Sequence, residues 1–197
     1  MENNVNYQTM IDKKKNPNKE FNSTLSFLLV LLAVVVIVTI VFTQIFNGVV
    51  VVGESMMNTL QDGDYLYMQV NYTEIEHGDI VVLEGEDKYI IKRVIALPGD
   101  SIYVDNGKLY RKEKGESEFK LIEEKYIKER WVENIATQNE PLVLGEDDIF
   151  VMGDNRNNSN DSRSSKYKDL KCSHVVGIVT PWSISCKGFL TKLFNLF

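Results

Sequence analysis

Residues 27–42 read FLLVLLAVVVIVTIVF, and Thr39 is the only polar side chain among them. Extended to residue 46, this stretch has about 20 residues, which as a helix cover the roughly 30 Å hydrocarbon core of a bilayer. No charged residue occurs between positions 21 and 53. Because a backbone in lipid must satisfy its own hydrogen bonds, the sequence predicts one transmembrane helix over residues 25–46.

Two other interpretations of this stretch are less favoured. A buried core helix of a small domain is rarely apolar on every face. A cleaved signal peptide usually has a shorter apolar run of about 7–15 residues, followed by a small-residue cleavage pattern that is not found here. The sequence therefore favours an uncleaved anchor.

The flanking charges predict the orientation of this anchor. Four lysines precede the span, at positions 13, 14, 15 and 19, and the first basic residue after it is Lys88. Basic residues are retained on the cytoplasmic side. We therefore expect residues 1–24 to form a cytoplasmic tail and residues 47–197 to form an extracytoplasmic domain of a single-pass protein.

Composition limits the remaining classes. The chain has 197 residues and a formal net charge of −6, which argues against a nucleic-acid binder. An extracytoplasmic location permits a disulfide between Cys172 and Cys186, but their separation in sequence leaves that pairing open. Neither cysteine has zinc-site spacing with His77 or His174, so no metal site is predicted.

Short apolar, β-branched segments recur along the domain between turn signals. They lie at residues 49–52, 79–83, 88–97, 101–104, 108–110, 149–152 and 174–180. Asn106-Gly107 predicts a hairpin, since both residues tolerate positive φ. The expected fold class is mainly β, behind an N-terminal transmembrane helix. The charge-rich segment 111–140 is compatible with a short helix or with a long excursion between strands. The tail GFLTKLFNLF at 188–197 either lies in the membrane interface or packs onto the domain.

Two side chains are candidates for a nucleophile and its base. Ser55 follows a β-branched run and a glycine, where its hydroxyl and nearby backbone amides can face an open edge, although most loop serines only form turns. Lys92 shares a predicted strand face with Ile90 and Val94, so burial can lower its pKa and leave an amine that accepts a proton. Taken alone, the local sequence favours an exposed edge-strand lysine.

A third segment, GDNRNNSNDSR at 153–163, follows a predicted strand and is dense in turn formers and charges. Its Asp and Arg residues can form bidentate pairs, and its Asn side chains can bond backbone groups. Local composition fits an ordered loop and a solvated surface loop equally well.

Four segments together resemble the bacterial type I signal peptidases, the Ser–Lys proteases of peptidase family S26, in a single-anchor, Gram-positive-like form. In order behind the anchor they are GESMMNTL at 53–60, GDIVV at 78–82, KRVIALPGD at 92–100 and GDNRNNSNDSR at 153–163. The resemblance covers nearly the whole chain. It implies an extracytoplasmic, β-rich signal-peptidase-like domain.

The resemblance also implies roles for individual residues. Ser55 attacks the scissile carbonyl, Lys92 acts first as general base and then as general acid, and Ser159 orients the lysine amine. The residues implied to support the site through ion pairs and hydrogen bonds are Asp154, Arg156, Asp161 and Arg163. The residues implied to line the substrate pocket, each equally compatible with plain core, are Met56, Leu60, Ile90 and Ile91.

Two positions depart from the family pattern. Asn58 stands where the motif has proline, which would stiffen the turn after the nucleophile. Gly53 stands where some members have a serine whose hydroxyl serves the oxyanion hole, so the Ser55 amide is the expected donor. We expect altered stability or rate at Asn58, with activity retained.

The predicted function is removal of N-terminal signal peptides from exported preproteins at the outer face of the cell membrane, near the translocation channel. The resemblance implies no metal, no organic cofactor and no nucleic acid. The alternatives are a specialised Ser–Lys protease of a secretion system, and a non-catalytic signal-peptidase-like accessory protein in surface-protein assembly. The retained Ser55 and Lys92 disfavour the accessory protein, and Asn58 is the one feature in its favour.

Overall fold

The computed structural model describes residues 17–85 and 87–196, and it divides into two units, Met1–Gln44 and Ile45–Phe197. In the first unit the chain forms helix α2 (Pro17–Ile45). Its Phe21–Ile45 portion contains an 18-residue window with a mean hydropathy of 3.3, none of which is buried, so the helix is long and apolar enough to cross a membrane. The predicted apolar helix is confirmed, and it begins before residue 25.

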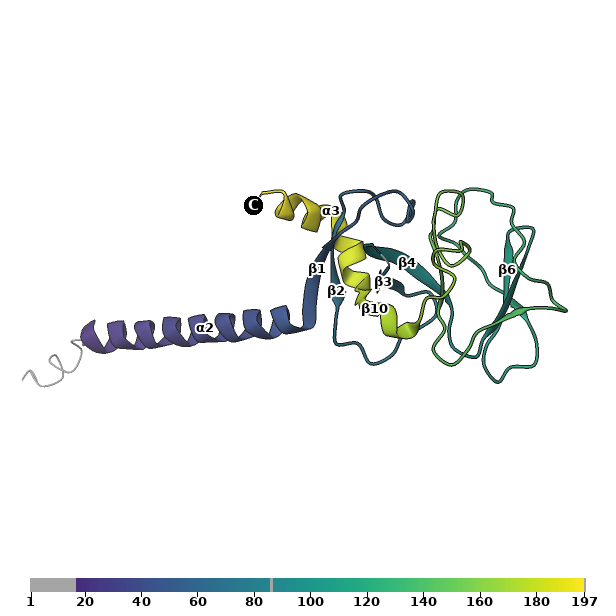
Figure 1. The fold of residues 1–197 in the computed structure, drawn as a ribbon. Coiled ribbons are helices and arrows are strands. Elements are labelled where there is room, and N and C mark those ends of the chain that lie inside the picture. The colour runs from purple at the N-terminus through teal and green to yellow at the C-terminus, as the bar shows by residue number, and fades with distance from the viewer. Residues whose placement is uncertain (1–16, 86, 197) are drawn as a thin grey trace, which may run out of the picture. The chain divides into compact units, whose positions relative to one another are not determined.

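A six-stranded antiparallel sheet forms the main part of the second unit (Figure 1). Its strands lie in the order β1-β2-β10-β3-β4-β9. Their bounds are β1 Phe46–Val50, β2 Tyr65–Gln69, β3 Ile80–Glu84, β4 Tyr89–Ala96, β9 Phe150–Met152 and β10 Val175–Val179. The predicted mainly-β fold class is confirmed, although the sequence analysis did not predict β2.

A second sheet, with the order β7-β6-β5-β8, is built around the predicted hairpin. Its strands are β5 Ser101–Asp105, β6 Lys108–Lys112, β7 Lys120–Leu121 and β8 Leu142–Val143. Asn106 and Gly107 have φ of 48° and 74°, as the hairpin turn requires. The uncertain segment 111–140 contains no helix; beyond the end of β6 it holds only β7 and one bridge, between Val104 and Ile135.

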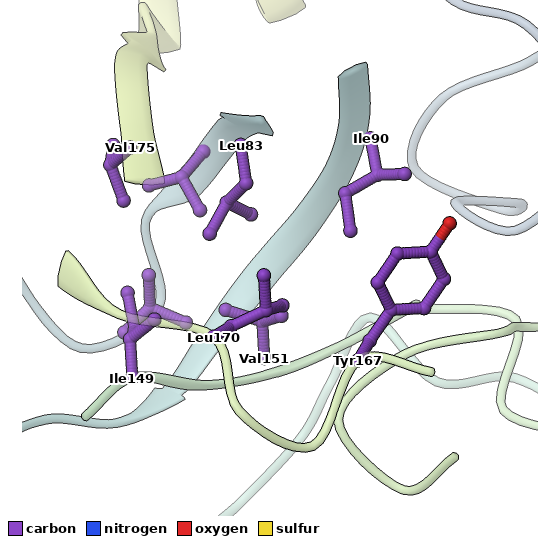
Figure 2. Close-up of a cluster of buried hydrophobic side chains, with 9 residues drawn as sticks. Leu83, Ile90, Ile149, Val151, Tyr167, Leu170 and Val175 are labelled. Carbon is purple, nitrogen blue, oxygen red and sulfur yellow. The ribbon is translucent and has the colours of Figure 1, made fainter. Parts of the chain in front are cut away.

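Alternation along β4 determines which side chains enter the core. Ile90, Lys92 and Val94 are all buried, so the predicted shared face is confirmed. Ile90 packs with Leu83, Val151 and the ring of Tyr167 in one hydrophobic cluster (Figure 2). Lys92 is thus an amine on a strand face that otherwise contributes apolar side chains.

Two helices flank β10. The short 3-10 helix η1 (Cys172–His174) comes before this strand, and helix α3 (Pro181–Phe194) follows it. Proline at the first helical turn suits the start of α3, because its missing N–H would have no partner there. The helix packs against β2, with the rings of Tyr67 and Trp182 stacked at 5.5 Å. Cys172 and Cys186 are both free thiols in this structure.

Candidate active site

The structure brings the two candidate residues together, although they lie 37 positions apart. Lys92 Nζ donates to Ser55 Oγ at 2.7 Å and to the carbonyl oxygen of Ile91 at 2.9 Å. Lys92 is only 4% exposed, whereas Ser55 lies half-buried in the turn that follows β1. The distance between the two side chains suits direct proton transfer.

The surroundings of Lys92 favour a neutral amine. Burial lowers the pKa of Lys92 from its ordinary value to about 8. The charge of Lys88 acts in the same direction, whereas Asp161 and Asp154 oppose it. Desolvation is the largest of these effects, so the buried amine loses its proton far more readily than a lysine in water.

The backbone around Ser55 leaves an amide available for an oxyanion. The Ser55 carbonyl accepts a hydrogen bond from the Asn155 amide at 3.0 Å, while no hydrogen bond in the described part of the chain uses the Ser55 N–H. Gly53 has φ of 90°, a conformation that strains any residue with a Cβ. This conformation gives a physical reason for glycine at position 53.

Gly153, the first residue of the 153–163 segment, touches the nucleophile turn directly. A Cβ at this position would lie 2.4 Å from the Ser55 carbonyl oxygen and 2.3 Å from Ser159 Oγ. Ser159 therefore lies against the turn, but the partners of Lys92 Nζ are Ser55 and Ile91, not Ser159. Orientation of the lysine by Ser159 stays a prediction.

Asp154 is fully buried and links three elements. Its two carboxylate oxygens accept bonds from Arg93 Nε at 2.8 Å and Arg93 Nη2 at 2.6 Å, and it also accepts a bond from the Thr59 hydroxyl. The backbone oxygen of Thr59 accepts in turn from Lys187 of α3 at 2.8 Å. The sequence analysis did not identify Arg93 or Thr59 as part of the site, although both lie inside the quoted segments.

The other charged residues of the loop are paired with carboxylates. Arg163 bonds both oxygens of Asp161, at 2.8 and 2.9 Å, and also Glu133 at 2.5 Å. Burial raises the pKa of Asp161, but the hydrogen bonds and charge of Arg163, together with other donors such as the Gly153 amide, hold it below the ordinary value. Arg156 is paired with Glu124. The loop is thus ordered, and two of its partners come from segment 111–140, for which the sequence suggested no role.

A groove of about 420 Å³ runs beside the Ser55–Lys92 pair. Residues 49–56 line one side, and residues 88–92 line another, together with Val82, Asn158, Asn160 and Tyr167. Of the four predicted pocket residues, Met56, Ile90 and Ile91 line this groove. Leu60 does not line it and is fully buried in a core cluster.

Comparison with known proteins identifies the family of this chain. The family model described as signal peptidase, peptidase S26, matches residues 24–183. The chain belongs to the signal peptidase family, peptidase S26. The predicted type I signal peptidase function and serine endopeptidase class are confirmed, and with the apolar helix α2 the protein is a membrane-anchored enzyme.

Individual relatives show how far the family resemblance extends. The chain is 37% identical over 166 residues to signal peptidase I P of Bacillus subtilis subsp. natto, covering 79% of this chain and 85% of that protein. It is 34% identical over 170 residues to signal peptidase I T of Bacillus subtilis strain 168, covering 83% and 84%. A crystal structure of a signal peptidase I from Enterococcus faecalis V583 aligns with a TM-score of 0.45 and 24% identity, covering 56% of this chain and 100% of that one.

Proposed function

We propose that Ser55 and Lys92 are the catalytic pair with which this enzyme hydrolyses the bond after a signal peptide. The neutral amine of Lys92 accepts the Ser55 hydroxyl proton while Ser55 Oγ attacks the scissile carbonyl carbon. The oxyanion receives a hydrogen bond from the Ser55 amide. The observation that carries this proposal is the 2.7 Å contact between Ser55 Oγ and a buried lysine whose pKa is lowered to about 8.

The same lysine completes the reaction. Collapse of the tetrahedral intermediate breaks the C–N bond, and the Lys92 ammonium returns its proton to the departing amine of the mature protein. Water then donates a proton to Lys92, and its hydroxide attacks the acyl-Ser55 ester carbon. The C–O bond to Ser55 breaks, the Lys92 ammonium returns its proton to Ser55 Oγ, and the signal peptide leaves with a free carboxylate. Asp154, Arg156, Asp161 and Arg163 support the geometry without taking part in bond breaking.

The groove beside Ser55 is the proposed site for the signal-peptide side of the substrate. Its apolar lining includes Val52, Met56, Ile90 and Ile91, and Lys88 lies on its rim. Met56 and Ile90 are 1% and 6% exposed, so packed neighbours hold both side chains in place. A groove with such fixed walls favours small residues by steric exclusion, in keeping with family substrates that carry Ala near the cut.

We further propose a location for each part of the chain. Residues 1–24 form the cytoplasmic tail, residues 25–46 cross the membrane, and residues 47–197 act outside the cytoplasm near the translocation channel. The lysines before the span support this orientation. Digestion of sealed cells with an external protease should remove the domain, whereas protection of the domain until lysis would reverse the orientation.

The exposed side chains of helix α3 are evidence that the catalytic domain contacts the bilayer. Trp182, Phe189 and Leu193 are 42%, 68% and 42% exposed, and their spacing places them on one helical face. Trp182 packs edge-on at 6.0 Å against Phe46, the residue that directly follows the last residue of α2. An exposed apolar face with two aromatic rings suits the membrane interface.

The deciding experiment is cleavage of a preprotein carrying an Ala-x-Ala site by the full-length enzyme in detergent micelles. We expect wild-type enzyme to cut after the second Ala, and Ser55→Ala and Lys92→Ala to be inactive while still folded. Undiminished cleavage by Ser55→Ala would exclude it as the nucleophile. A folded wild-type protein that cuts no preprotein would instead favour the accessory role.

A further inference from the structure

The irregular segment 122–135, between β7 and β8, supplies partners for the arginines that surround the catalytic pair. We call residues 122–135 the bracing segment. It contributes two carboxylates and two aromatic rings, from Glu124, Tyr126, Trp131 and Glu133. None of its residues lines the groove beside Ser55. Its ion pairs and ring contacts are therefore made to the catalytic loop and to Arg93, and not to the groove.

Glu124 is the counter-ion of Arg156. Arg156 Nη1 donates to Glu124 at 2.9 Å and Nη2 donates to the second carboxylate oxygen. The two side chains are 1% and 6% exposed, and the guanidinium also lies 4.7 Å from the Trp131 ring. A guanidinium buried this deeply requires a counter-charge. With that pairing in place, Arg156 Nε donates to the Gly153 carbonyl at 3.1 Å.

Tyr126 links this ion pair to the strand that carries Lys92. Its hydroxyl donates to Glu124 at 2.7 Å, and burial raises the pKa of Tyr126, so the donor proton is retained. Its ring lies 4.0 Å from Cζ of Arg93, the residue next to Lys92. Arg93 uses two of its nitrogens on Asp154. Tyr126 therefore covers the Arg93 guanidinium that pairs with Asp154.

These contacts converge on the turn that holds the nucleophile. The Gly153 amide donates to Asp161, and the Asn155 amide donates to the Ser55 carbonyl. Gly153 also packs directly against that carbonyl. A shift of the 153–156 turn thus moves Ser55 against Lys92 Nζ, across a 2.7 Å contact that proton transfer needs to keep short.

We propose that Glu124 and Tyr126 are positioning residues for the Ser55–Lys92 reaction, acting through Arg156 and Arg93. The proposal rests on the catalytic roles given to Ser55 and Lys92 above. It assigns these two side chains to the chemical step and not to substrate capture. A small misplacement of reacting groups is enough to cost a large part of the rate.

The test compares Glu124→Gln and Tyr126→Leu with Glu123→Gln in the full-length enzyme. Glu123 is the matched control, because it is adjacent, has the same side chain, and is 77% exposed. We expect Glu124→Gln to lower kcat by about tenfold or more, with KM within about threefold of wild type. Tyr126→Leu retains apolar volume but loses the ring over Arg93 and the hydroxyl bonded to Glu124, and it should lower kcat as Glu124→Gln does. Glu123→Gln should match wild type.

A double substitution separates positioning from general destabilisation. If Glu124 acts through Arg156, Glu124→Gln combined with Arg156→Met should lower kcat no further than the worse single variant, whereas independent losses would multiply. Rates are taken per folded molecule, from thermal unfolding of each sample, at temperatures below its transition. A kcat within twofold of the control for both Glu124→Gln and Tyr126→Leu would overturn the proposal, as would multiplying losses in the double variant.

Wild type and Ser55→Ala are assayed alongside. If wild type is inactive or Ser55→Ala is active, the proposed catalytic pair fails and the positioning role fails with it. If both behave as expected while the bracing variants match Glu123→Gln, only the positioning role is wrong.

Discussion

The lowered pKa of Lys92 predicts the pH dependence of cleavage. With a pKa of about 8, the neutral fraction of Lys92 is about 1% at pH 6, about 9% at pH 7 and about 50% at pH 8. An ordinary lysine, with its pKa of 10.5, would be about 0.03% neutral at pH 7. Burial therefore provides about 300 times more reactive base at neutral pH.

The measurement is kcat/KM for a signal-peptide substrate between pH 6 and pH 10, because kcat/KM reports ionisations of the free enzyme. We expect kcat/KM to rise tenfold per pH unit below pH 7 and to reach half of its maximum near pH 8. Lys88→Met removes a charge that lowers the pKa of Lys92, so the rising limb of the pH profile should move toward higher pH. A limb centred near pH 6 or above pH 10, in enzyme that stays folded throughout, would refute Lys92 as the titrating base.

Three further substitutions follow from the same structure. Lys92→Met should abolish cleavage but raise the free energy of unfolding at pH 7 by up to about 3 kcal/mol, from a pKa shift of about 2.5 at about 1.36 kcal/mol per unit. That gain should shrink from pH 8 to pH 10.5, where the unfolded wild-type chain binds more protons than the folded one, and chemical denaturation at both ends of this range measures it. Gly153→Ala forces a Cβ to 2.4 Å from the Ser55 carbonyl oxygen, and we expect about 1–3 kcal/mol of destabilisation and at least about tenfold lower kcat/KM. Gly188→Ala is its control, since a Cβ there meets nothing within 4 Å, and an equal loss in both variants would contradict the steric argument. Asn58→Pro at an exposed turn position should raise stability by about 0.4–1 kcal/mol with kcat/KM within about threefold, and a lower thermal midpoint would show that the turn does not accept proline.

Much of the fold could be predicted because its signals are local. The apolar run, the Asn106-Gly107 turn and the alternation through Ile90, Lys92 and Val94 each depend on residues close in sequence. The start of α3 also had a local signal, since Thr180 and Pro181 form a typical helix beginning, but only the tail after it was considered. Strand β2 alternates Tyr with Leu and Met, and it too could have been predicted.

The site was predictable only in part, because its supporting contacts join distant segments. Resemblance to the family identified Ser55 and Lys92, but the carboxylate partner of Arg156 and the second carboxylate partner of Arg163 lie 32 and 30 positions away. Those partners, Glu124 and Glu133, stand among many charges in an irregular segment without periodicity. Nothing in such a sequence distinguishes a buried counter-ion from a solvated one.

Pairing of charges near Lys92 explains how one lysine can lose its proton beside two carboxylates. Asp154 and Asp161 are both buried, and each of them raises the pKa of Lys92. Each is also held at both oxygens by an arginine, Arg93 for Asp154 and Arg163 for Asp161. A carboxylate so engaged exerts a weaker net field on a third group than an unpaired one, and desolvation remains the largest influence on the amine, ahead of Asp161. By pairing with these carboxylates, the arginines limit how far the structural supports of the site stabilise the charged form of its base.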